Sequence, residues 1–225
     1  MDFNLSKLFE PFISKIEGLQ EAIEEIATEM PESLIELAKY GWYIDMDFLP
    51  KTPIELLHKI KNGKIDIVDE FLCDYYSEKL DYINIKLCRE YPNRELIFKE
   101  AFSCYDQKQY FASIALFLTQ ADGICYDKTK KLFFLNNKDL KKKKKYVPEV
   151  EAEIQRVSGD FMDFLLEPIK EASAINDNIG NIRNFPVNLN RHSILHGMKT
   201  DYGTRTNSLK IISFVMYLSD VLKKN

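Results

Sequence analysis

A three-and-four spacing of apolar residues along most of this 225-residue chain constrains its fold more than any other feature. Near the N-terminus, eight apolar residues keep this spacing with glutamates between them: Leu5, Leu8, Phe9, Phe12, Ile16, Leu19, Ile23 and Ile26. Such spacing places apolar side chains on one face of an α-helix, and the alternation typical of strands is nearly absent. The sequence therefore predicts an all-α protein that opens with an amphipathic helix.

Proline, glycine and capping residues divide the rest of the chain into further helices. Pro31 is predicted to begin a helix over Glu32–Tyr40, and Gly41 is predicted to end it. The other helices are expected over residues 53–61, 65–90, 94–104, 108–122, 148–174, 186–196 and 204–223.

A boundary is expected where a proline interrupts the helical pattern, at Tyr91-Pro92-Asn93. The sequence thus predicts an N-terminal helical region of unknown role, 1–92, and a helical bundle, 93–225, with an irregular insertion near 125–147. The insertion contains the lysine run 141–145. Such a run is more often a mobile, solvated segment than a binding site, although it can also gather a polyanion.

The composition is that of a folded globular protein, with 45% hydrophobic and 29% charged residues. The net charge of -4 is uneven: residues 1–100 hold 12 basic and 21 acidic residues, which leaves 19 basic and 14 acidic residues for 101–225. A basic C-terminal half suits a polyanionic partner, whereas the acidic half does not. No apolar run is long enough to cross a membrane and no signal peptide is evident, so we expect a cytoplasmic protein without a membrane partner.

Other chemistries find little support in the sequence. The four cysteines are widely spaced, form no Cys-x-x-Cys pair, and are expected to be reduced thiols. His192 and His196 are four residues apart, but no third ligand is evident, so neither a metal site nor a cofactor is predicted. Phosphate-binding glycine loops and serine-nucleophile motifs are also missing from the sequence. His58, in the acidic half, is expected to be structural.

Two of the three histidines lie beside an arginine in the segment 190–197, Asn-Arg-His-Ser-Ile-Leu-His-Gly. Histidine can exchange a proton near neutral pH, and arginine is a permanent planar cation that suits phosphate oxygens. On a helix, Arg191 and His196 are about 140° apart and can flank one groove. Gly197 is expected to form a left-handed cap directly after His196. The segment therefore predicts chemistry on a phosphate.

This segment resembles the signature of HEPN domains, in which an Arg, a polar residue and then a His end a helix. Here those positions are Arg191, His192 and His196, and Gly197 follows. The helix expected before residue 123 is similar to the family helix that packs against the motif. The resemblance covers about residues 94 to 223. One subset of the family carries a modifiable Tyr two residues after the His, where this chain has Met198.

The resemblance implies an up-and-down helical bundle in the C-terminal part that dimerises and joins two motifs in one cleft. It also implies metal-independent cleavage of single-stranded RNA by the ribose 2′-hydroxyl, which leaves a 2′,3′-cyclic phosphate. His196 would transfer the proton, and Arg191 would stabilise charge on the phosphate. A microbial toxin or antiviral defence effector is the expected role, with RNA, a second copy of the chain, and an antitoxin or regulatory protein as partners.

Several other residues are candidates for a supporting part in this site. Asn190 and His192 are expected to orient the catalytic pair, and Asp122 is a candidate carboxylate for holding Arg191 or His196. Three residues after the motif are candidates for lining the cleft: Asp201, Tyr202 and Thr204. Each has a structural interpretation as well, since Asp122 can simply face water near the end of its helix. Thr204 can cap the last helix.

A second interpretation of the motif remains open at this stage. The chain can be a non-catalytic helical module that binds RNA, a nucleotide or a partner protein. Catalysis predicts that Arg191 and His196 are both accessible and converge, whereas burial of both against carboxylates favours binding alone. The sequence does not indicate the RNA target, the activating signal, or the role of the first 92 residues.

Overall fold

A computed structural model describes residues 26, 28–49, 51–135, 148, 150, 152, 165–177 and 185–223. The described residues form helices and their connections without an extended strand, so the all-α prediction is confirmed at this level. The expected amphipathic helix before residue 26 and the lysine run lie outside these residues, as does most of the expected helix 148–174. No helix in the described part is long and apolar enough to cross a membrane.

The helices have the following bounds. The first described helix covers residues 28–39, so Pro31 lies within the helix and does not begin it, contrary to the prediction. Then follow α2 Lys51–Lys61, α3 Ile65–Glu78, α4 Leu80–Glu90, the 3₁₀ turn η1 Pro92–Arg94, α5 Glu95–Asp106, α6 Tyr110–Thr129, α8 Glu167–Lys170, α9 Arg191–Leu195 and α10 Arg205–Val221.

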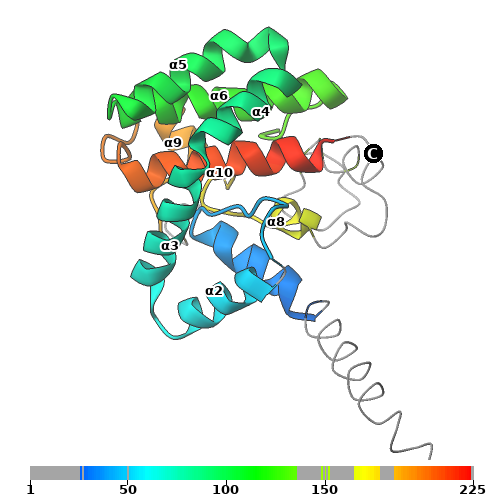
Figure 1. Ribbon diagram of the computed structural model, residues 1–225, viewed down its shortest axis with the longest axis vertical. Helices are drawn as coiled ribbons and strands as arrows, with labels where there is room; N and C mark the ends of the chain where they lie inside the picture. The colour runs from blue at the N-terminus through cyan, green and yellow to red at the C-terminus, as the bar shows by residue number, and fades with distance from the viewer. Residues whose placement is uncertain are drawn as a thin grey trace, which may run out of the picture.

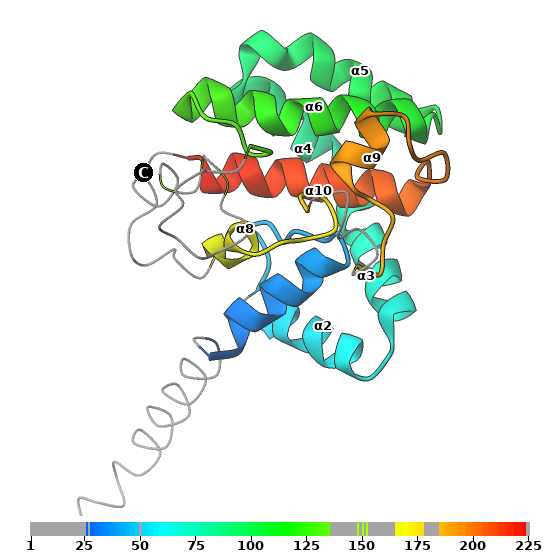
Figure 2. The same ribbon diagram turned by 180° about the vertical axis from the view of Figure 1, so that it is seen from behind.

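The last helix, α10, is the centre of the molecule. Every residue from Ser208 to Val221 is buried, because other elements cover the helix on all sides. Figures 1 and 2 show α6 along one side of α10, with α5 beyond it, and the 28–39 helix and α8 on the other side.

One hydrophobic core extends across residue 92. It includes Trp42 and Tyr76 from the first part of the chain and Phe117 and Phe214 from the second. A buried ion pair between Lys86 on α4 and Asp220 on α10 also joins the two parts. Residues 1–92 and 93–225 thus share their packing where the structure describes them.

The predicted helix 65–90 is two helices, which corrects the sequence-based assignment. Lys79 lies between α3 and α4, where its amide donates to the Tyr76 carbonyl three residues back at 3.3 Å, so the regular helix is interrupted. Its ammonium group donates to Asp47 at 2.8 Å and to the Tyr75 hydroxyl at 2.6 Å. The helix changes direction here, and Lys79 can reach the 41–49 connection.

The helix α6 is longer than predicted, because it continues through Gly123 to Thr129. Glycine in mid-helix usually weakens a helix, but here its missing side chain has a packing role. The Arg94 guanidinium occupies the place where a Cβ at position 123 would lie. Arg94 donates from there to Asp127 at 2.7 and 3.0 Å and to Gln120 at 3.0 Å. Residues 125–129 of the expected irregular insertion are therefore helical.

Candidate functional site

The motif segment forms a short helix, α9, whose start is fixed by Asn190. The Asn190 Oδ1 accepts a hydrogen bond from the Ser193 amide at 3.1 Å, which is a standard N-cap. Its Nδ2 donates to the Asp177 carbonyl at 2.7 Å. The predicted helix 186–196 is therefore wrong in extent, because this cap begins the helix at Arg191. Asn190 is buried and positions α9 without facing solvent.

Arg191 points inwards from α9 towards α6. Its Nη2 lies 3.8 Å from the Asp122 Oδ2, and its guanidinium lies 4.9 Å from the centre of the Phe134 ring. The side chain keeps 23% of its surface exposed, and its buried Nε has no hydrogen-bond partner among the described residues. The structure thus brings Asp122 and Arg191 together, as the sequence suggested, but at the outer limit of an ion pair. Phe134 was not expected to contact the motif in this way.

Asp122 is held mainly by the backbone. Its Oδ1 accepts a hydrogen bond from the Phe134 amide at 2.9 Å. Burial raises the pKa of this carboxyl, and the Phe134 amide and the Arg191 charge offset part of that rise. Phe133 and Phe134 are themselves buried and pack in the core.

His192, in the first turn of α9, and His196, directly after its last residue, lie side by side. The amide of His196 donates to the carbonyl of His192 at 3.0 Å, which separates the two residues by one helical turn. Their rings are nearly parallel, with a 9° angle and centroids 5.9 Å apart. His196 is exposed, and Gly197 follows with φ +68°, which confirms the expected left-handed cap. Burial lowers the pKa of His192, and the Arg191 and His196 charges add to this effect.

The three candidate cleft residues after the motif mostly serve the start of α10. Thr204 accepts from the Asn207 amide at 3.1 Å and is the N-cap of α10. Tyr202 packs edge-on against Phe111 with ring centroids 5.0 Å apart. Asp201 is exposed and accepts from Asn188 at 3.3 Å. No contact in the described residues joins these side chains to Arg191 or His196.

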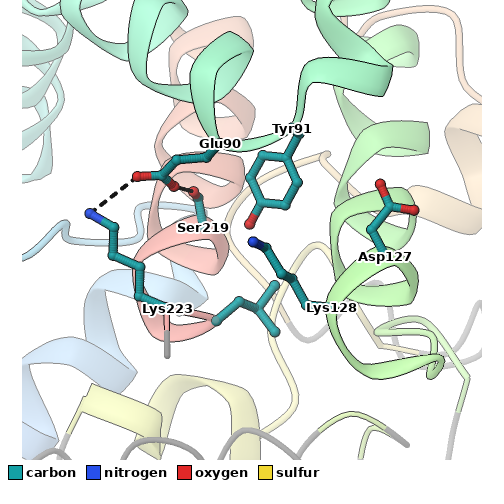
Figure 3. A pocket seen from close by; sticks show the side chains of 7 residues that line it. Glu90, Tyr91, Asp127, Lys128, Ser219 and Lys223 are labelled. Atoms are coloured by element: carbon teal, nitrogen blue, oxygen red, sulfur yellow. Dashed lines mark hydrogen bonds and ion pairs between the residues drawn. The ribbon is translucent and has the colours of Figure 1, made fainter. Parts of the chain in front are cut away.

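A pocket lies away from the motif, where α4, α6 and α10 end (Figure 3). Its volume is about 410 Å³, and its lining residues are Glu90, Tyr91, Asp127, Lys128, Ser219, Leu222 and Lys223. Its carboxylates are already paired: Glu90 with Ser219 and Lys223, and Asp127 with Arg94. No sequence motif marked this pocket, because its residues come from three separate helix ends. The motif and the pocket are therefore two different features of the molecule.

Comparison with known proteins leaves the motif as the main indication of function. No protein-family model matches this chain, and neither a curated protein nor a solved structure matches it. Within the described ranges, no three His, Cys, Asp or Glu side chains are grouped to hold a metal ion. The fold and site define an all-α protein with an Arg-His segment at the end of a short helix.

Proposed function

We propose that this chain is a metal-independent endoribonuclease of the HEPN type that cleaves single-stranded RNA. The observation that carries the proposal is the position of His196, exposed at the end of α9 and one turn from His192. Neither imidazole ring has a hydrogen bond within the described part of the chain, so a ring nitrogen is available for proton transfer. The side-by-side packing of α5, α6 and α10 suits the helical bundle that the family resemblance implies.

In the proposed reaction, the ribose 2′-oxygen attacks the adjacent phosphorus, and the bond from phosphorus to the 5′-oxygen breaks. A histidine accepts the 2′-hydroxyl proton, and an imidazolium donates a proton to the departing 5′-oxygen. Arg191 stabilises the negative charge on the phosphate oxygens. Its 3.8 Å contact with Asp122 is long for an ion pair, so an RNA phosphate competes with a weak partner.

We propose that two chains pair through this face to give a composite site. Cleavage benefits from one acid and one base, and a two-fold axis supplies His196 from each chain. Leu195 and Met198 are exposed on either side of His196 and offer apolar surface to a second copy. A toxin or antiviral defence effector, controlled by an antitoxin or regulatory protein, is the biological role that we propose.

The test is cleavage of single-stranded RNA by the purified chain in EDTA, over about pH 6 to 9. We expect a 2′,3′-cyclic phosphate end, a loss of about 100-fold or more for His196→Ala, and a similar loss for Arg191→Ala. His58→Ala is the matched control, because His58 is exposed on α2 and its imidazole interacts with Glu29, away from the motif. Intact RNA with the wild type, or equal cleavage by His196→Ala, would refute the proposal.

The orientation of Arg191 favours a second candidate function. A partly buried guanidinium turned towards Asp122 and Phe134 meets half of what a non-catalytic binding module predicts, whereas His196 is exposed. Such a module binds RNA, a nucleotide or a partner protein and turns nothing over. An RNA affinity that falls steeply as the salt concentration rises, without cleavage by the wild type at any pH tested, would support this function.

A further inference from the structure

The two motif histidines have the spacing of a chelating pair. Residues four apart on a helix face the same side, and the 3.0 Å bond from the His196 amide to the His192 carbonyl keeps this turn helical. The parallel rings, with centroids 5.9 Å apart, leave a gap that side-chain rotation can close. Zinc–nitrogen bonds are about 2.0 to 2.1 Å long, so both rings must turn inwards to hold one ion.

The ring nitrogens of this pair are free to bind. Neither ring has a hydrogen bond in the described residues, whereas the third histidine, His58, contacts Glu29 at 3.2 Å. Metal ions bind the neutral imidazole, because a protonated ring nitrogen has no lone pair to donate.

Charge near the pair also permits a cation. Arg191 is next to His192 in sequence, but its guanidinium turns away towards Asp122 on α6. On the following loop, residues 196–204, the charged residues are Lys199 and Asp201, and both contact Asn188. Asp122 therefore offsets part of the Arg191 charge, and Lys199 and Asp201 carry opposite charges.

We propose that His192 and His196 form a two-nitrogen site for a divalent ion of the late first transition row, such as Zn²⁺ or Ni²⁺. Imidazole suits these metals, and Ca²⁺ and Mg²⁺ prefer oxygen ligands. One ion binds per chain, and water completes its coordination, because no third side chain is grouped with the pair in the described residues. This revises the sequence-based expectation that the chain has no metal site.

The binding does not depend on the proposed cleavage and is tested without RNA. Titration calorimetry of the full chain with Zn²⁺ alone, and separately with Ni²⁺ alone, is expected to give one ion per chain. His192→Gln and His196→Gln each lower the affinity by about tenfold or more, a loss seen even when supporting groups of metal sites are removed. His58→Gln is the matched control and is expected to bind like the wild type.

Circular dichroism of each variant checks that the substitution leaves the chain folded. Equal affinity of His196→Gln and wild type would overturn the proposal, and so would the absence of a binding heat with both Zn²⁺ and Ni²⁺. A loss in His58→Gln matching that in His196→Gln would also overturn it. If the chain binds metal as expected but leaves RNA intact, the ribonuclease proposal fails and the metal site stands.

Discussion

At the scale of single residues, Asn190 positions the candidate site without facing solvent. Its side chain caps α9 and also bonds the Asp177 carbonyl, so one amide fixes the helix start against the 165–177 segment. We expect Asn190→Ala to lower the free energy of unfolding by about 2 to 3 kcal/mol, since a cap and a buried hydrogen bond are both lost. Thr204→Ala removes an exposed cap and is expected to cost about 1 kcal/mol. Urea denaturation measures both, and equal losses would contradict this role.

Asp122 predicts a pH dependence of stability with a definite sign. Burial raises its pKa in the folded state, so between its unfolded and folded pKa the folded state binds more protons. The stability contributed by this carboxyl therefore falls as pH rises through that window. We expect Asp122→Asn to remove this fall in urea denaturation measured at several pH values.

Asp127 is the control for this measurement, because the sign is reversed. Hydrogen bonds from Arg94 lower the pKa of Asp127, so its contribution is present above the unfolded pKa and is lost as pH falls through the folded pKa. Asp127→Asn is thus expected to flatten the acid side of the profile. A change of the same sign in both variants would show that their carboxyls do not titrate as described.

At the scale of helices, α6 requires glycine at position 123, because the Arg94 guanidinium fills the space that a Cβ would take. Ala is about 1 kcal/mol better than Gly in a helix interior, yet a Cβ at position 123 overlaps the Arg94 guanidinium. We expect Gly123→Ala to destabilise the chain by about 1 to 2 kcal/mol, because Arg94 must leave Asp127 and Gln120. In the Arg94→Ala background the same change is expected to stabilise it. A double-mutant cycle in urea measures this reversal, and the same sign in both backgrounds would exclude the contact.

The helices that follow from local rules were predictable, and those set by distant contacts were not. The spacing of apolar residues and the Thr204 cap place α10 correctly. The break at Lys79 could not be predicted, because lysine is a good helix former and its partner Asp47 lies 32 residues away. The apolar residues before Asn190 resemble a helical pattern, so the sequence predicts a helix that starts too early. The hydrogen bond from Asn190 to the Asp177 carbonyl, which helps to fix the actual start, depends on tertiary structure.

The same distinction applies to the candidate site. Gly197 after His196 is a local signal, and the left-handed cap that it predicts is present. The direction of Arg191 is not local, because Asp122 and Phe134 belong to another part of the chain. The sequence is compatible with two roles of Asp122, as a partner of Arg191 or as a residue that faces water. Only the packing of the chain decides between them.

At the scale of the whole molecule, the shared core and one buried ion pair connect residues on both sides of the predicted boundary at 92. Lys86 and Asp220 are each about 5% exposed or less, so water cannot solvate either charge when its partner is removed. Removing one partner of a buried pair leaves an uncompensated charge, which costs about 3 to 5 kcal/mol. The stability of the N-terminal region is thus tied to the last helix.

This connection predicts one cooperative unfolding transition. Trp42 is the only tryptophan, is buried before residue 92, and hydrogen-bonds Asp69, so its fluorescence reports on the N-terminal region. Far-ultraviolet circular dichroism reports on all helices, and we expect both probes to give the same urea midpoint. Asp220→Asn is expected to lower both midpoints together, whereas Lys99→Met, which removes an exposed pair with Glu95, leaves them unchanged. Separate transitions for the two probes would instead show that residues before 92 unfold as a unit of their own.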